Sequence, residues 1–172
     1  TKQVLEWPVL LEKLASLTYS SLGAEHCRKL PFEQDYRLAQ IRLNETSEML
    51  SLHSSITPFP KLIFSNIENS LLRAEKNASL ESKELRDIAQ IIKLGEQVRN
   101  CLTINQVMLT NLRIYKDQLH DLSFLRTEID LCVNQEGEII ESATPVLFEA
   151  IQETRRIKEH MRERLESMLS SM

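Results

Sequence analysis

The chain has 172 residues, of which 42% are hydrophobic and 27% charged, and its formal net charge is −4. This composition is typical of a folded domain rather than a disordered one, and the negative charge argues against a general attraction to nucleic acid. No apolar run reaches the roughly 18 residues of a membrane span and no signal peptide opens the chain, so we expect a cytoplasmic protein with no membrane partner.

Few residues in this chain favour loops. Only three glycines and five prolines occur, so we predict an all-α fold, an irregular helical bundle. The cysteines, Cys27, Cys101 and Cys132, are odd in number and far apart, which favours free thiols over a disulfide framework.

The first 31 residues predict one helix and a short turn of a second. Pro8 opens the first helix, and Gly23 stands where a helix ends in a left-handed residue. The turn that follows runs from Ala24 to Leu30 and stops before Pro31. The apolar face of the first helix consists of Leu10, Leu11, Leu14 and Leu17.

A longer helix is expected from Asp35 to about His53, and it is apolar on two sides. We therefore predict that it lies between neighbouring elements. A proline-containing loop over residues 54–65 and a short helix over residues 66–76 follow. The two apolar arcs are Leu38, Ile41, Met49 and Leu52 on one side and Ala39, Leu43 and Leu50 on the other.

We predict that Ser82 caps the most regular helix of the chain, with Glu81 and Glu84 near its positive end. Its core row is Leu85, Ile88, Ile92 and Gly95. A second repeat, spaced by 4, 3, 4 and 3 residues, predicts another packed helix. That repeat is Met108, Leu112, Tyr115, Leu119 and Leu122, and Ser123 then caps a short helix that ends near Val133.

The last 40 residues predict a turn and a long helix. Apolar and polar residues alternate over 133–141, around Asn134-Gln-Glu-Gly137, which predicts a small β-hairpin. Thr144 is a good N-cap and Pro145 a good first helical residue, and the pattern continues to Met172. A helix of roughly 40 Å is longer than this domain can bury. We therefore expect a helical core domain over residues 1–143, a projecting arm over 144–172, and a longer protein around them.

The terminal helix carries five cations, interleaved with five glutamates. We predict the i,i+3 ion pairs Glu153–Arg156 and Glu159–Arg162, and a solvated helix rather than a direct nucleic-acid face. The candidate residues for a weak nucleic-acid or partner contact are Arg155, Arg156, Lys158, Arg162 and Arg164. An apolar seam beside them, suited to a second helix, consists of Ile157, Met161, Leu165 and Met168.

The strong signatures of catalysis and nucleotide binding are missing. His26 and Cys27 are adjacent, and neighbouring side chains on a helix do not converge on one metal. The four histidines lie far apart and no carboxylate pair stands out. We predict no catalytic, cofactor-binding or metal-binding residue in this chain, and no enzymatic activity of its own.

Several segments, taken in order, resemble the N-terminal region of the type-two bacterial MutS family, the homologues that lack the mismatch-recognition domain. Residues 5–15 are similar to the family's first helix, L-E-F-x-x-I-L-x-x-L-A, with Trp7 in place of Phe, and residues 21–25 to its S-x-L-G-x-E turn. Residues 44–50 resemble its E-E-T-x-E-A-L helix.

The second half of the chain continues the resemblance. Leu72-Arg-Ala-Glu-Lys76, then Leu80 and Glu84-Leu-Arg-Asp-Ile-Ala89, resemble in order the family's L-x-R-A-x-x-G-x-x-L-x-x-x-E-L-x-x-I segment, except that Asn77 and Ala78 replace the glycines usual there. Residues 137–145 look like G-E-x-x-D-S-A-S-P, the most specific of these motifs, and residues 157–169 resemble the outgoing arm.

The resemblance implies a helical core and the start of a lever arm, which link an ATPase mechanically to a clamp. It also implies a full-length homodimer that binds ATP and Mg, carries a Small MutS-related nuclease domain, and acts on branched DNA to suppress recombination or on collided ribosomes. The partner expected for this chain is then the remainder of its own polypeptide. The alternative is a self-contained helical adaptor whose terminal helix mediates coiled-coil pairing.

Overall fold

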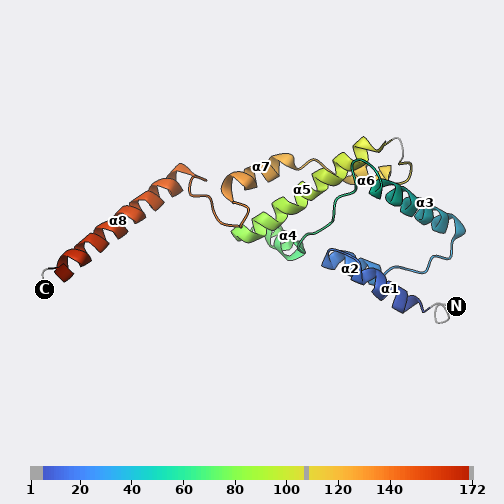
Figure 1. Cartoon of the computed structure of the whole chain (residues 1–172), viewed down its shortest axis with the longest axis horizontal. Helices are drawn as coiled ribbons and strands as arrows, with labels where there is room; N and C mark the ends of the chain where they lie inside the picture. Colours follow the sequence, from blue (N-terminus) through green and yellow to red (C-terminus); the bar gives the residue numbers. More distant parts are fainter. Residues whose placement is uncertain (1–5, 107–108, 171–172) are drawn as a thin grey trace.

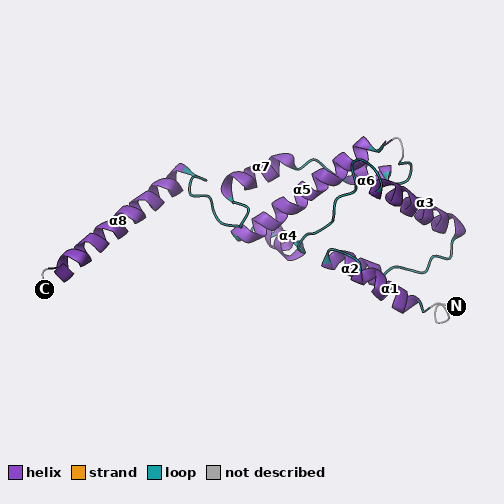
Figure 2. Ribbon diagram, in the orientation of Figure 1, coloured by secondary structure: helices purple, strands orange, loops and turns teal. Residues whose placement is uncertain are grey.

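The computed structural model describes residues 6–106 and 109–170, and these residues form eight α-helices and no β-strand (Figures 1 and 2). The predicted all-α class is therefore confirmed. In chain order the helices are α1 (Trp7–Ser16), α2 (Ser21–Arg28), α3 (Tyr36–His53), α4 (Glu68–Glu75), α5 (Ser82–Ile104), α6 (Arg113–Gln118), α7 (Ser123–Cys132) and α8 (Pro145–Ser170).

The helix α5 is the central element of the core. It packs along α7 and contacts α6, while α1 and α2 pack against each other as a separate helical hairpin. Figure 1 shows α8 projecting away from the other helices, at the opposite end of the molecule from α1 and α3. The arrangement is an elongated core with one long arm.

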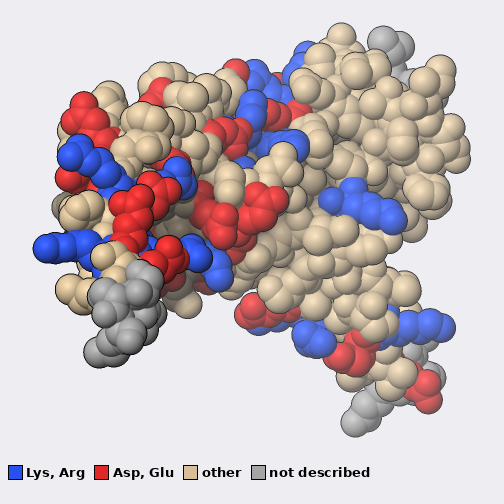
Figure 3. All heavy atoms as spheres, turned by 60° about the vertical axis from the view of Figure 1, so that its left-hand side comes forward, with Lys and Arg blue, Asp and Glu red and all other residues tan. Residues whose placement is uncertain are grey.

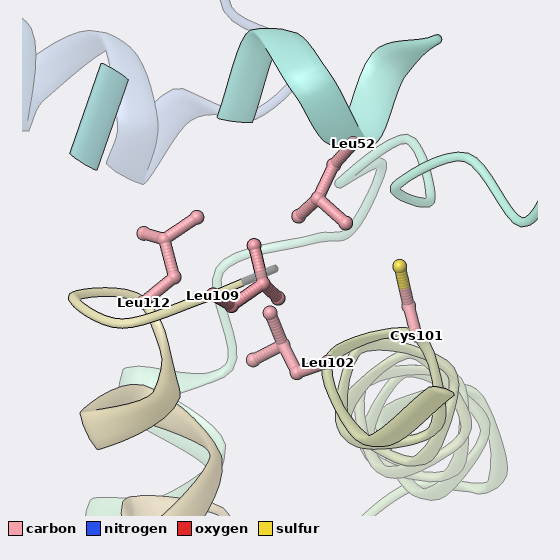
Figure 4. Close-up of a cluster of buried hydrophobic side chains, with 5 residues drawn as sticks. All are labelled: Leu52, Cys101, Leu102, Leu109 and Leu112. Atoms are coloured by element: carbon pink, nitrogen blue, oxygen red, sulfur yellow. The ribbon is translucent and has the colours of Figure 1, made fainter. Parts of the chain in front are cut away.

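Two hydrophobic clusters lie at different positions along α5. The first, at its C-terminal end, brings together side chains from α3, α5 and the segment before α6 (Figure 4). It consists of Leu52, Cys101, Leu102, Leu109 and Leu112. The second lies between α5 and α7 and consists of Ile88, Ala89, Ile92, Ile129 and Val133. The predicted burial of Ile88 and Ile92 is confirmed.

The first helix ends earlier than predicted. The Ser20 hydroxyl accepts the Gly23 N–H at 3.1 Å and caps a new helix, so Gly23 lies inside α2 rather than at a helix end. The buried residues of α1 are Leu11 and Ala15. The remaining predicted face is exposed, by 45% at Leu10, 38% at Leu14 and 70% at Leu17.

The helix α3 begins as predicted, because the Asp35 carboxylate accepts the N–H of Arg37 at 2.7 Å. The prediction that it lies between two neighbours is wrong for the described residues. Leu52 is buried and Met49 partly so, but the other leucines and the isoleucine of both arcs are exposed. Apolar periodicity alone did not distinguish a core face from one that this chain leaves uncovered.

The packed helix predicted over residues 108–122 is also wrong. Met108 lies outside the described residues, and only Arg113–Gln118 is helical. Leu112 of the predicted repeat is buried, and so is Leu109, which the repeat did not include, but both lie in an irregular segment. The N–H groups of that segment have a side-chain acceptor, Glu48, which replaces the hydrogen bonds of a helix.

The β-hairpin predicted over residues 133–141 is not supported. Among the described residues, this segment contains a single isolated bridge, between Val133 and Ile139. The Asn134 side-chain oxygen accepts the N–H groups of Glu136 and Glu138, so the segment is held as a turn.

The arm helix begins as predicted. The Thr144 hydroxyl accepts the Leu147 N–H at 3.2 Å, and Pro145 is the first residue of α8. The helix continues through Ser170, and the last two residues of the predicted helix lie outside the described residues.

Replacing Ile92 with Ala is expected to lower the free energy of unfolding by about 2–4 kcal/mol, because the side chain is buried between α5 and α7. Urea unfolding followed by circular dichroism measures this change. Ile114→Ala is the control, since Ile114 is 60% exposed. Equal losses in the two variants would contradict the assignment of the second cluster.

Candidate functional site

The candidate site residues all lie exposed on α8, where positive and negative side chains alternate (Figure 3). Arg156 pairs with Glu153 at 3.7 Å, as predicted. Arg162 pairs with Glu166 at 3.2 Å, so the predicted Glu159–Arg162 pair is wrong. Arg162 therefore pairs with the glutamate one turn toward the C-terminus, at the i,i+4 spacing that also brings side chains together on a helix.

Arg155 connects the arm to the core. Its guanidinium pairs with the carboxylate of Glu141, in the segment that leads into α8. By contrast, Lys158 and Arg164 have no ion pair among the described residues. Since residues on a helix turn by about 100° each, Arg155, Lys158 and Arg162 lie within about 60° of one another around α8. Arg156 and Arg164 lie on other sides of the helix, so the five cations do not form one basic patch.

The apolar seam of the arm is solvent-exposed, by 52% at Ile157, 58% at Met161 and 59% at Leu165, and Met168 is exposed as well. The seam is therefore present on one side of α8, as predicted.

The sequence motifs that carry the family resemblance place charged residues at structural contacts inside the core. In the motif over residues 44–50, the Glu48 carboxylate accepts the backbone N–H groups of Thr110, Asn111 and Leu112 at 2.9 Å each. It also accepts the Asn111 side-chain N–H at 2.8 Å. One carboxylate thus holds the segment before α6 against α3.

These hydrogen bonds decide the ionisation of Glu48. Desolvation is the largest single influence and raises its pKa, but the N–H donors of residues 110–112 together outweigh it. The pKa of Glu48 is therefore lowered from its ordinary value, and the carboxylate is ionised in the folded protein at neutral pH.

A second motif joins α4 to α5. The Arg73 guanidinium donates to the Glu84 carboxylate at 2.9 Å and to the Ser79 carbonyl at 2.7 Å. The same carboxylate accepts the Ser70 hydroxyl and, at the first turn of α5, the Glu81 N–H, both at 2.8 Å. Arg73 and Glu84 of this motif therefore join α4 to α5.

The residue that replaces a family glycine has a left-handed backbone. Asn77 has φ of 55° and follows the C-cap of α4. The Ala78 N–H donates to the Arg73 carbonyl at 3.0 Å, which closes the last turn of α4 as a left-handed C-cap does. Glycine adopts this conformation most easily and asparagine more readily than most residues, which explains the substitution.

A charge network between α5 and α7 was missed by the sequence reasoning. Arg86 pairs with Asp130 at 2.9 Å, and Arg126 bridges Asp130 at 2.9 Å and Glu96 at 3.1 Å. The i,i+4 spacing of Arg126 and Asp130 was the one signal available in the sequence. The links to α5 depend on the fold.

The described part of the chain contains no group of three or more metal-ligating side chains. None of its helices has an apolar stretch that could cross a bilayer.

Cys27, Cys101 and Cys132 are free thiols, and burial raises the pKa of Cys101. A polar hollow of about 500 Å³ between α5 and α6 contains Arg99 and Asp121, which pair at 3.6 Å.

Comparisons with known proteins find relatives over nearly the whole chain, although no family model matches it. The chain is 26% identical to "Endonuclease MutS2" of Ruminiclostridium cellulolyticum over 99% of its length, and 31% identical to "Endonuclease MutS2" of Brevibacillus brevis over 95%. It is 27% identical to "Putative endonuclease MutS2" of Bacillus subtilis over 97%. The chain spans 20–22% of the length of these relatives, about a fifth.

Replacing Glu48 with Gln is expected to lower the free energy of unfolding by about 1–2 kcal/mol at pH 7, because three backbone N–H groups lose a charged acceptor. Chemical denaturation measures it. Glu128→Gln is the control, since Glu128 is exposed and makes no ion pair among the described residues.

The stabilisation by Glu48 should decrease at low pH. Because the pKa of Glu48 is lowered in the folded protein, its contribution to the free energy of unfolding is present above the unfolded glutamate pKa of about 4.3. That contribution is lost as the pH falls through the folded pKa. The difference between wild type and Glu48→Gln should therefore shrink below about pH 4. A constant difference down to pH 2.5 would contradict the role of the ionised carboxylate.

Replacing Asn77 with Ala is expected to destabilise the protein by about 1 kcal/mol, because alanine is strained at a positive φ, whereas Asn77→Gly should change stability by less than about 0.5 kcal/mol. Thermal unfolding of the two variants tests this. If alanine were tolerated as well as glycine, the left-handed C-cap of α4 would be wrong.

Proposed function

The chain is related to the MutS2 proteins over nearly its whole length, and from this premise we propose that it is a non-catalytic core and the first part of a lever arm in a MutS2-like protein. In this role it links an ATPase mechanically to a clamp that binds a nucleic acid or a ribosome. The domain division is a core over residues 1–143 and an arm over 144–172.

The observation that carries this proposal is the arm itself. The helix α8 runs for 26 residues, which corresponds to about 39 Å at 1.5 Å per residue, and it projects from the core (Figure 1). A continuous helix transmits a displacement along its length better than a loop of the same length.

The base of the arm supports the same role. The Thr144 cap fixes where α8 begins, and the Arg155–Glu141 ion pair ties its third turn to the preceding segment. That segment continues back to α7, which the network around Asp130 joins to α5. A movement of the core would thus reach the arm through short polar contacts.

The activity of the whole protein is part of the proposal. Relatives that are named endonucleases support this activity for the full-length protein. We propose that the full-length protein is a homodimeric ATPase that uses ATP and Mg outside this chain, and that it acts on branched DNA or on collided ribosomes. A self-contained coiled-coil adaptor is less well supported, because the relatives are about five times as long as this chain.

Breaking α8 tests the mechanical role. In the full-length protein, Gln152→Pro removes an intrahelical hydrogen bond in the first half of the arm, at a cost of about 3 kcal/mol to the helix. ATP hydrolysis is measured alone, with a four-way DNA junction, and with ribosomes. We expect the stimulated rate to fall close to the unstimulated one, while the unstimulated rate stays within about twofold.

Gln152→Ala is the matched control, because it keeps the helix and removes the same exposed side chain. It should respond to DNA and ribosomes as the wild type does. Full stimulation of the proline variant would show that the arm does not carry the coupling. Whichever ligand stimulates the wild type distinguishes DNA from the ribosome.

A further inference from the structure

A pocket of about 690 Å³ lies where the α1–α2 hairpin meets the end of α3 and the loop that follows α3. Its walls come from residues around the start of α2, from the last turns of α3, and from the loop over residues 58–62. Its volume lies in the range of roughly 300–1,000 Å³ that is typical of sites for small molecules. The pocket is therefore a candidate ligand site, separate from the arm and from the charge network of the core.

The walls of this pocket are mainly apolar. Met49 and Phe59 line it and also pack against the first hydrophobic cluster, so its inner wall is continuous with the core. Pro58 and Pro60 on the loop, and Tyr19 between α1 and α2, add rings around this wall. Rings have few torsions to restrict and present flat apolar faces, which suit a planar apolar ligand.

The charge in the lining of the pocket has one sign. Lys61 is a cation, and the described residues that line the pocket include no Asp or Glu. The Lys61 ammonium lies 5.6 Å from the centre of the Tyr19 ring, a cation–π contact that joins the loop to the hairpin. His53, in the last turn of α3, adds an imidazole N–H. An anionic group in the pocket would therefore meet donors and no competing carboxylate.

The hydroxyl groups of the pocket are of two kinds. Thr18 donates to the Ala15 carbonyl at 2.8 Å and Ser20 accepts the Gly23 N–H at 3.1 Å, so both hold the backbone of the hairpin itself. The hydroxyl of Tyr19, a residue that is 60% exposed, can donate to a ligand. A few polar groups beside an apolar wall are the usual composition of a small-molecule site.

We propose that this pocket binds a small aromatic molecule that carries one anionic group, such as a carboxylate, a sulfonate or a phosphate. The ring lies against Met49 and Phe59, and the anionic group pairs with Lys61. Because the ligand contacts the hairpin, α3 and the loop together, its binding fixes the hairpin relative to the core. The inference goes beyond the proposed function and does not rest on it.

The lining favours a small anion over larger partners. A nucleic-acid strand needs a groove of several cations that follows its backbone, whereas Lys61 is the one Lys or Arg among the described residues that line the pocket. A neutral apolar segment would cover the Lys61 ammonium without pairing it, which costs free energy. A single anionic group on an apolar ring avoids both problems.

Methionine methyl NMR of the full-length protein tests the site. Met49 lines the pocket, and Met161 on the exposed arm is an internal control; Met49→Leu and Met161→Leu assign the two signals. The probe is anilinonaphthalene sulfonate, an aromatic anion. We expect the Met49 signal to move saturably as the probe is added, because the rings lie against its methyl group, and the Met161 signal to stay in place.

Two results of this titration would overturn the proposal. A Met49 signal that stays unchanged throughout would mean that the pocket takes no such ligand, including the case in which another segment of the polypeptide fills it. Met49 and Met161 signals that move together over the same probe concentrations would mean general binding to apolar surface.

The anionic group is tested with two further compounds and a variant. Phenylnaphthylamine has the rings of the probe without the sulfonate, and inorganic sulfate is an anion without rings. Dissociation constants come from the Met49 titration. We expect the sulfonate probe to bind about tenfold more tightly than phenylnaphthylamine, and Lys61→Met to abolish this preference, because the charged pair is lost. Sulfate alone should leave the Met49 signal in place.

Lys93→Met is the matched control, since Lys93 is an exposed lysine of α5 away from the pocket. It should change the dissociation constant of the sulfonate probe by less than about twofold. Equal affinity of the wild type for the two ring compounds, or an unchanged preference in Lys61→Met, would overturn the assignment of an anionic ligand.

Discussion

A single helix, α5, joins the two hydrophobic clusters of the core, and each cluster is completed by residues from a different part of the chain. At one end, the Glu48 carboxylate holds the N–H groups of the segment before α6 against α3, and Leu109 and Leu112 of that segment pack against α5. At the other end, α7 is aligned by the charges around Asp130. Removing either carboxylate, Glu48 or Asp130, would leave its N–H or guanidinium partners unpaired beside an apolar cluster. These two side chains therefore help to fix how the apolar residues of each cluster pack against α5.

The elements with local signals could be predicted from the sequence. Asp35 at α3, Glu81 and Glu84 at α5, and Thr144 at α8 mark helix starts through hydrogen bonds between residues two or three positions apart. The N-cap of α5 is Glu81 rather than the predicted Ser82. The family resemblance could be read for the same reason, since its motifs are short segments. The structure then shows what some of the motif residues do; Asn77, for example, has a left-handed backbone at the end of α4.

The errors have more than one physical cause: in one segment a long-range contact outweighs local periodicity, and elsewhere apolar periodicity does not tell a covered face from an uncovered one. The spacing of Leu112, Tyr115 and Leu119 is that of a packed helix, yet a carboxylate more than 60 residues away satisfies the N–H of Leu112 and the helix is short. The leucines of α1 and α3 have helical spacing but are exposed in this chain. The spacing of charges along α8 also did not specify which cations form ion pairs within the described residues.

The turn before the arm sits directly on α5. Gly137 has φ of +79°, and a Cβ added there would lie 3.0 Å from Lys83 Cγ and 3.4 Å from its Cα. The Gly137 backbone therefore lies close to both the backbone and the side-chain stem of Lys83, in a space that admits no further side-chain atom unless Lys83 shifts. Because the turn at Gly137 is already close to α5, it cannot move much nearer to that helix. A displacement at the tip of α8 should therefore appear as a rotation of the arm about residues 137–144 rather than as a shorter distance between the arm and the core.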